Sequence, residues 1–313
     1  MDESNEISLS ELLRQQMESW SLVKTNFGAL DKVRTKDFEM GGLRISVQFN
    51  PARIVSSAAK VDAESIKKRK CFLCPANLPD EQIRLPFHKD YLVLVNPYPI
   101  FREHFTVPAL RHEPQSILER IGDFVDLARR YDGYTIIYNG PCCGASAPDH
   151  AHFQIVTYGQ MPLDTDVLSK GKPINIEGFP GGKVNVLTDY LRNGFVLKSE
   201  SREESIGLFK KIYSVLPALE DETTESPINL FGYYLSGEWV LVVIPRRRHR
   251  PWQYAAVGKE RFVSSPGAAD IGGLFVTVRE EDFNKIDAKL LEDIYRQVCF
   301  SDREIEDMAA GLS

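Results

Sequence analysis

Short stretches in which apolar residues alternate with polar ones, or run together between turn residues, predict a series of β-strands. In the first half of the chain these stretches are Leu43–Phe49, Tyr91–Asn96, His104–Pro108, Tyr134–Tyr138 and His152–Tyr158. In the second half they are Gly194–Lys198, Leu230–Leu235 and Trp239–Pro245. The pattern predicts a strand-rich sheet.

Apolar residues at helical spacing predict helices that would cover this sheet. Near the N-terminus the spacing places Leu9, Leu12, Leu13, Met17 and Trp20 on one stripe. Ser8 and Glu11 form the pattern of a capping box at its start, and Ser301 and Glu304 repeat that pattern near the C-terminus. Further helices are expected over residues 116–130, 202–216 and 290–298. Together with the strands they predict an α+β fold.

One segment stands out as a connection between two units. Residues 161–184 contain Pro162, Pro173, Pro180 and four glycines, which interrupt regular structure. The order of elements before the segment is loosely repeated after it, with a strand, a helix and two further strands. We therefore predict an N-terminal unit over residues 1–184 and a C-terminal unit over residues 185–313.

Composition and charge exclude several classes of protein. The chain has 313 residues, of which 43% are hydrophobic and 26% charged, and its net charge is −6. No overall positive field attracts nucleic acid, so we expect no nucleic-acid partner, and local charge must meet any anionic substrate. The apolar runs are far shorter than the roughly 20 residues that span a bilayer. The N-terminus is acidic and lacks the pattern of a secretory signal, so a cytoplasmic location without membrane contact is expected.

The run from His150 to Gln154 carries the most chemistry. If it is a strand, successive side chains point to opposite faces, so His150, His152 and Gln154 share one face while Phe153 packs on the other. The preceding loop, Gly140–Asp149, is rich in glycine and small residues, whose backbone N–H groups approach an anion closely. An imidazole nucleophile beside such donors is what transfer at phosphorus requires. The alternative is that these are ordinary polar residues of an edge or core strand.

The cysteines indicate a metal site. Cys71 and Cys74 form a CxxC, which supplies half of a tetrahedral zinc site when two more ligands come from elsewhere. His112 and His150 are candidates, although the sequence does not separate His112 from His104. Two buried thiols remain an alternative. A redox role is less favoured, because no thioredoxin-like strand-to-helix setting is evident.

Two basic runs, Lys67–Lys70 and Arg246–Arg250, are of a kind that usually forms a solvated surface. The second follows an apolar strand, and this position would allow one or two of its arginines to contact a substrate phosphate. The sequence does not decide between the two interpretations.

The segment Gly144–Gln154 resembles the HxHxQ signature of the transferase branch of the histidine-triad superfamily. This branch includes galactose-1-phosphate uridylyltransferase, diadenosine tetraphosphate phosphorylase and the GDP-hexose phosphorylases. Similarity to the GDP-hexose phosphorylases extends to Val47–Arg53, Asn193–Leu197 and Pro266–Phe283. The resemblance implies two histidine-triad-like units, each with an antiparallel sheet and flanking helices. One departure is an additional residue in the loop between Ser146 and His150.

The resemblance also implies roles for particular residues. His152 would be the nucleophile that becomes nucleotidylated, and Gln154 would bind the phosphate. A structural zinc would be held by Cys71, Cys74, His112 and His150. Substrate would be contacted by Asn50, Arg53, Asn96, Asn139, Gly144 and Ser146. For attack, His152 needs a neutral nitrogen, and a hydrogen bond from its other N–H to a backbone carbonyl would fix that tautomer. Activity should fade below the ordinary histidine pKa, near 6.5.

The expected reaction is nucleotidyl transfer from a nucleoside diphosphate sugar, such as a GDP-hexose, to phosphate or a sugar phosphate. A dinucleoside polyphosphate phosphorylase and a nucleotide hydrolase are alternatives that share the nucleophile. A zinc-stabilised nucleotide sensor, which binds ligand without forming an adduct, is an alternative of another class. The sequence leaves the nucleobase, the sugar and the acceptor open. It also leaves the assembly open, with a homodimer as the candidate.

Overall fold

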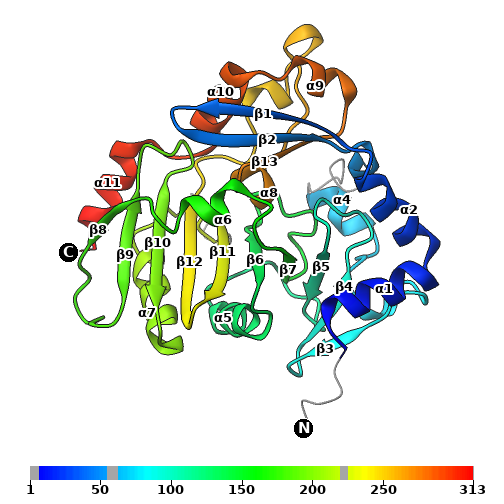
Figure 1. Cartoon of the computed structure of the whole chain (residues 1–313), viewed down its shortest axis with the longest axis horizontal. Helices are drawn as coiled ribbons and strands as arrows, with labels where there is room; N and C mark the ends of the chain where they lie inside the picture. Colours follow the sequence, from blue (N-terminus) through cyan, green and yellow to red (C-terminus); the bar gives the residue numbers. More distant parts are fainter. Residues whose placement is uncertain (1–6, 55–62, 219–224, 313) are drawn as a thin grey trace.

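The computed structural model describes residues 7–54, 63–218 and 225–312. Its centre is a ten-stranded sheet in the order β3-β4-β5-β7-β6-β11-β12-β10-β9-β8, with every neighbouring pair antiparallel (Figure 1). The strands are β3 (Leu85–Phe87), β4 (Tyr91–Val95), β5 (His104–Pro108), β6 (Tyr134–Asn139), β7 (His152–Thr157), β8 (Lys172–Ile174), β9 (Lys183–Leu187), β10 (Gly194–Ser199), β11 (Ile228–Leu235) and β12 (Glu238–Pro245). The fold is α+β, as predicted.

The two halves of the chain meet in the middle of this sheet. There β6 pairs with β11, with Asn139 opposite Asn229 and Ile136 opposite Gly232. The strands on one side of this pair come from residues 85–157, and those on the other side from residues 172–245. The segment 161–184, expected to be a connection, also contains α6 (Pro162–Asp166), β8 and the start of β9. Position 184 therefore falls inside β9. The division into units 1–184 and 185–313 stays a prediction.

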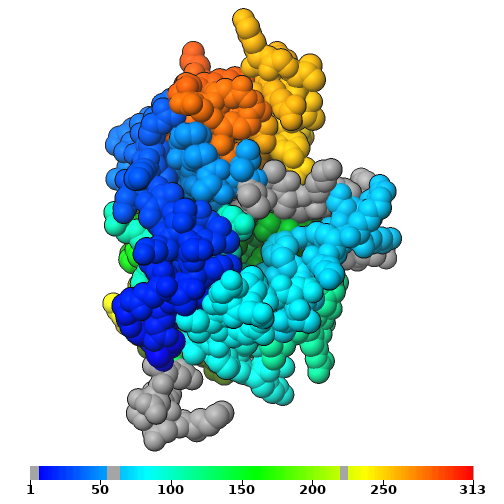
Figure 2. Space-filling model, turned by 90° about the vertical axis from the view of Figure 1, so that its right-hand side faces the viewer, coloured from blue at the N-terminus to red at the C-terminus, as the bar shows by residue number. Residues whose placement is uncertain are grey.

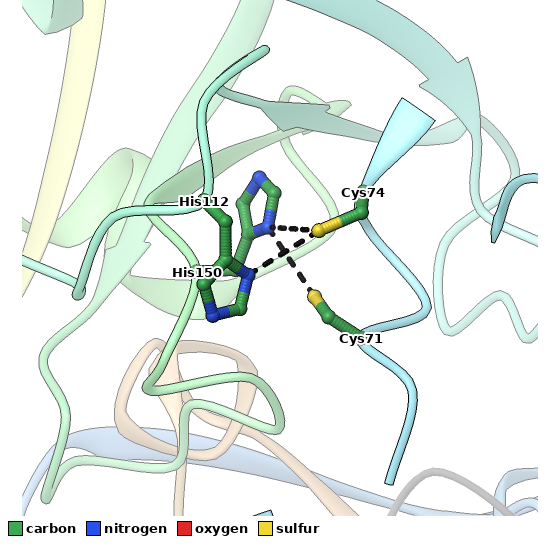
Figure 3. A group of neighbouring side chains, drawn as sticks. All are labelled: Cys71, Cys74, His112 and His150. Atoms are coloured by element: carbon green, nitrogen blue, oxygen red, sulfur yellow. Dashed lines mark hydrogen bonds between the residues drawn. The ribbon is translucent and has the colours of Figure 1, made fainter. Parts of the chain in front are cut away.

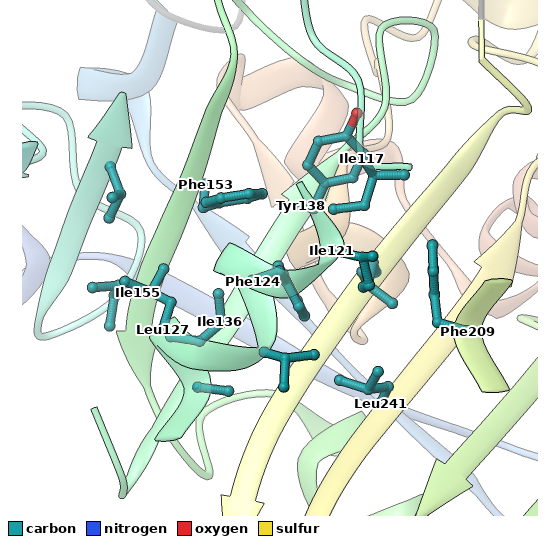
Figure 4. Packing of buried hydrophobic residues seen from close by; sticks show 14 of the residues in the cluster. Ile117, Ile121, Phe124, Leu127, Ile136, Tyr138, Phe153, Ile155, Phe209 and Leu241 are labelled. Carbon is teal, nitrogen blue, oxygen red and sulfur yellow. The ribbon is translucent and has the colours of Figure 1, made fainter. Parts of the chain in front are cut away.

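Helices α5 (Ile121–Arg130) and α7 (Arg202–Tyr213) cover one face of the sheet (Figure 1). Phe124 of α5 packs against Phe153 of β7, with ring centroids 5.6 Å apart (Figure 4). The predicted helix over 116–130 was wrong in its first turn, and α5 begins only at Ile121. The residues before it form a separate turn, which the Arg120 N–H closes on the carbonyl of Ile117, while the Ile117 N–H donates to the carboxylate of Glu225.

A smaller sheet lies against the other face, formed by β1 (Arg34–Met40), β2 (Leu43–Phe49) and β13 (Leu274–Thr277) (Figure 1). β13 runs parallel to β2, which brings C-terminal residues beside an N-terminal hairpin. The helices α8 (Ala268–Ile271), α9 (Glu280–Lys285) and α10 (Ala288–Val298) accompany it. The remaining helices are α1 (Leu9–Ser19), α2 (Ser21–Leu30), α4 (Ala63–Lys68) and α11 (Asp302–Ala310).

Both predicted helix starts near the chain ends are confirmed. The side chain of Ser8 accepts a hydrogen bond from the Glu11 N–H at the start of α1. Ser301 and Glu304 form a reciprocal capping box at the start of α11. Among the described helices, none has the length and apolar composition needed to cross a membrane.

Candidate active site

A cavity of about 850 Å³ lies where the two sheets and the loops between them meet. Figure 2 views the side of the molecule on which N-terminal segments, blue to cyan, meet the orange and yellow C-terminal segments. Seven of the predicted catalytic and substrate-binding residues line the cavity: Arg53, Asn96, Asn139, Gly144, Ser146, His152 and Gln154. Asn50 does not, because its amide is turned toward the protein and donates to Gln48 Oε1 and to the carbonyl of Pro99.

The strand β7 explains how His152 and Gln154 reach the cavity. They are two residues apart and face it, while Phe153 between them enters the core on the opposite side. The prediction that His150 shares this face was wrong, since β7 begins at His152. His150 sits in a turn closed by its own N–H and the carbonyl of Ala147, and its ring points away to the cysteines.

His152 is held in one tautomer. Its Nδ1 lies 2.8 Å from the backbone carbonyl of His150, and a carbonyl only accepts, so Nδ1 carries the proton and Nε2 keeps its lone pair. This is the hydrogen bond that the sequence predicted. The side chain of Gln115 fixes the backbone, accepting from the His152 N–H at 2.8 Å and donating to its carbonyl at 2.9 Å. Burial lowers the pKa of His152 to about 4, well below the 6.5 expected for an exposed ring.

Gln154 is also oriented by a neighbour. His104 Nδ1 accepts from the Ile100 N–H, so the proton is on Nε2, which donates to Gln154 Oε1 at 2.6 Å. Burial, together with the charge of Arg53, lowers the pKa of His104 to about 3 and keeps the ring neutral. Since the oxygen of the Gln154 amide is occupied, the NH₂ group is the end that remains to donate to a ligand.

The loop after β6 approaches the C-terminal part of the chain closely at Gly144. This residue has φ +92°, and a Cβ there would lie 2.4 Å from the Cα of Gly267. Beside it, Asn139 Oδ1 accepts from Asn229 Nδ2 and from the Ala268 N–H. Glycine is therefore required by the backbone contact between the two halves of the molecule.

Four side chains form a group that is placed to hold a metal ion. The ligand atoms of Cys71, Cys74, His112 and His150 all lie within 4.8 Å of one another (Figure 3). His150 Nδ1 is 3.3 Å from Cys71 Sγ and 3.6 Å from Cys74 Sγ, and His112 Nδ1 is 3.3 Å from Cys74 Sγ. In a tetrahedral site with zinc–sulfur and zinc–nitrogen bonds of ordinary length, neighbouring ligand atoms are about 3.5 Å apart. The group fits that geometry.

The surroundings of this group support a metal rather than free thiols. His150 Nε2 donates to the carbonyl of Ala109 at 2.8 Å, and His112 Nε2 lies 3.8 Å from a carboxylate oxygen of Asp149. Metal-bound histidines usually have such partners on their second nitrogen. The structure also separates the two histidines that the sequence could not, because His112 joins the cysteines and His104 instead contacts Gln154.

The comparisons with known proteins agree with this architecture. Residues 12–157 match the model of a domain of unknown function, DUF4922. The yeast Ap4A phosphorylase Apa2 superimposes with a TM-score of 0.58 at 18% identity, covering 90% of this chain and 97% of the yeast chain. The chain therefore has the fold of the yeast Ap4A phosphorylase. The same yeast protein in complex with Ap4A gives a TM-score of 0.56 at 16% identity, covering 93% and 97%. No curated protein matches the sequence itself.

Further residues reach the cavity that the sequence analysis did not assign. Arg246 is not among them: it is buried, and its guanidinium donates to Asn229 Oδ1 and the carbonyls of Pro266 and Val298. His249, Arg250, Ser265 and Asp270 do line the cavity. Of the other basic run, Lys68 and Arg69 lie on the wall. Gln115 was missed as well, since nothing in its local sequence signals that it holds His152.

Proposed function

We propose that this protein is a nucleotidyltransferase that takes a nucleoside monophosphate from a nucleoside diphosphate sugar, such as a GDP-hexose, onto His152. The observation that carries the proposal is the state of His152. It is neutral, its proton is held on Nδ1 by the His150 carbonyl, and it faces a cavity large enough for a nucleotide. The phosphate or sugar phosphate that then collects the nucleotide completes a phosphorylase-type reaction.

In the first step, the lone pair of His152 Nε2 attacks the α-phosphorus. The bond from that phosphorus to the bridging oxygen breaks, and its electron pair leaves on the sugar phosphate. The ring keeps its Nδ1 proton and becomes positively charged, which the carbonyl of His150 stabilises through the existing hydrogen bond. The Gln154 amide NH₂ and the N–H groups of the loop after β6 are the donors for the phosphate oxygens.

A metal ion has a structural part in this proposal. Zinc on Cys71, Cys74, His112 and His150 would fix the turn that carries the His150 carbonyl. It would also steady the loop after β6, because Arg69, close to the cysteines in sequence, forms an ion pair of 2.7 Å with Asp149. In the proposed step the nucleophile is His152 Nε2, and His152 lines the cavity.

A dinucleoside polyphosphate is the second candidate for the donor. It is supported by the yeast Ap4A phosphorylase of the same fold, whose structures contain Ap4A in one case and AMP in another. The nucleophile and the first step would be the same, and only the leaving group would differ. Hydrolysis and sensing without turnover remain outcomes that the following experiment separates.

The test is covalent labelling with nucleotide sugars and dinucleoside polyphosphates that carry radioactive α-phosphate. The protein is denatured after incubation and examined for label that is lost in acid and retained in base, as a phosphoramidate is. Wild-type protein should be labelled and His152→Ala should not. His88→Asn is the matched control, because His88 is exposed and lies outside the cavity lining. Binding without any label would support the sensor, and label in His152→Ala would contradict the mechanism.

A further inference from the structure

Three side chains on the C-terminal wall of the cavity form a connected group. Arg250 and His249 follow β12, and Ser265 lies shortly before α8; all three line the cavity. The hydroxyl oxygen of Ser265 accepts from Arg250 Nε at 3.1 Å and lies 3.0 Å from His249 Nε2. The hydroxyl of Ser265 thus contacts both the imidazole of His249 and the guanidinium of Arg250.

The guanidinium of Arg250 is oriented but not neutralised. Its central carbon lies 4.1 Å from the centroid of the Tyr254 ring, which holds its plane. Its Nε bonds to Ser265, while the two terminal nitrogens have no hydrogen bond and no carboxylate within 4.0 Å among the residues that the structure describes. Arg69 on the same cavity wall differs, because it is paired with Asp149. A fixed arginine fork with free ends matches the oxygens of a phosphate.

The imidazole of His249 adds hydrogen-bonding capacity without adding charge. Burial, together with the charges of Arg250 and Arg246, lowers the pKa of His249 to about 4, so the ring is neutral near pH 7. The group therefore has one full positive charge, supplied by Arg250, and two neutral hydrogen-bonding groups beside it. This composition suits an anion that exchanges during turnover better than one that is held permanently.

The group lies close to the residues around His152. Ser265 is three residues before Ala268, whose N–H bonds to Asn139 Oδ1 at 2.7 Å, and three residues span at most about 11 Å. Gly267, between them, packs on Gly144 of the loop after β6. A phosphate at Arg250 would be a near neighbour of a phosphate held at Gly144 and Gln154.

We propose that Arg250, Ser265 and His249 form the subsite for the phosphate on the far side of the bond that His152 breaks. This proposal rests on the proposed function and gives the site at which the acceptor of that reaction binds. The subsite first holds the departing phosphate of the donor and then receives orthophosphate or a phosphate monoester. An oxygen of that acceptor attacks the α-phosphorus, the bond to Nε2 breaks, and its electron pair returns to the ring, which is neutral again with its Nδ1 proton unchanged.

The test separates discharge of the nucleotide from loading. Nucleoside 5′-phosphorimidazolides of adenosine and guanosine load His152 with imidazole as leaving group, so loading does not need a second phosphate. The loaded protein is then chased with increasing inorganic phosphate. Arg250→Ala should load normally but need roughly tenfold to hundredfold more phosphate for half-maximal discharge, since a charged hydrogen-bonding partner is lost.

Two further variants guard against a merely structural effect. Arg250→Lys keeps the charge without the fork and should load normally while showing a smaller rise in the phosphate needed. Arg248→Ala is the matched control, since Arg248 is exposed, lies outside the cavity lining and should behave as the wild type. Arg250→Ala with a wild-type phosphate dependence, or wild-type protein that discharges equally fast without phosphate, would overturn the subsite alone. Wild-type protein that is never loaded would contradict the proposed function and the subsite with it.

Discussion

The contact between His104 and Gln154 allows a quantitative prediction about how the first step is organised. His104→Phe keeps an aromatic ring beside Phe101, whose centroid is 5.4 Å from the histidine ring, but removes the 2.6 Å hydrogen bond to Gln154 Oε1. A polar group left without its partner costs about 1–3 kcal/mol. The amide of Gln154 would then turn part of the time and present its oxygen, instead of its NH₂ group, to the phosphate.

If this cost appears wholly in the step that forms the bond to His152, the rate falls by roughly five- to hundredfold, at about 1.4 kcal/mol for each factor of ten. Nucleotide affinity should change little, because the other cavity contacts remain. The assay is single-turnover labelling of His152 over a range of nucleotide concentrations, which gives the maximal rate and the half-saturating concentration separately.

A conservative variant distinguishes orientation from simple loss of packing. His104→Gln retains an N–H donor of similar reach and should recover most of the rate, whereas His104→Phe should not, with thermal unfolding measured for both. The reasoning would be refuted if His104→Phe labels at the wild-type rate, or if His104→Gln is as slow as His104→Phe.

Three more predictions address the pH dependence, the metal and the loop. Burial lowers the pKa of His152 to about 4, and attack needs the neutral ring. Labelling should therefore persist from pH 7 to 5 and fall only as the pH approaches 4. A fall in the labelling rate near pH 6.5 would contradict this prediction. Cys71→Ser should lose roughly one zinc ion per chain by elemental analysis and unfold at lower temperature. Cys142→Ser, which lies outside the cluster, should keep the zinc content and the unfolding temperature of the wild type. Native protein without metal would rule the site out. Gly144→Ala should lower the free energy of unfolding, measured in denaturant, by about 1–3 kcal/mol. Gly159→Ala is the control and should have a smaller effect, because Gly159 has a similar φ of +81° but an added Cβ would meet nothing within 4 Å. Equal effects would show that the contact with Gly267 is unimportant.

The sequence predicted those strands whose pattern is strong and local. The bounds of β5, in which every residue is buried, and of β7 were predicted to within one residue. β1 was missed because five of its seven residues are polar and four of the seven are exposed, so neither face shows a continuous apolar pattern. β13 has four residues, and its place beside β2 is set by tertiary contacts, which leave no periodic signal in so short a segment.

The candidate site divides in the same way. His152, Gln154 and the loop after β6 belong to one continuous segment and could be predicted together. The complete set of metal ligands could be assigned only from the folded structure. The choice between His104 and His112 depends on the direction in which each of these two side chains points. The sequence left open whether an arginine of the run Arg246–Arg250 contacts a phosphate. The pairing of Arg250 with Ser265 could not be predicted, since the two residues come from separate loops and meet only in the folded chain.

The central claim is that His152 carries the nucleotide during turnover, and peptide mass spectrometry tests it most directly. Protein incubated with nucleotide sugars or dinucleoside polyphosphates, quenched in base and digested, should yield the peptide containing His152 with the added mass of a nucleoside monophosphate. The added mass should disappear when inorganic phosphate is supplied before quenching. Product formation by a protein whose His152 peptide is never modified, or a modification on another residue, would contradict the account.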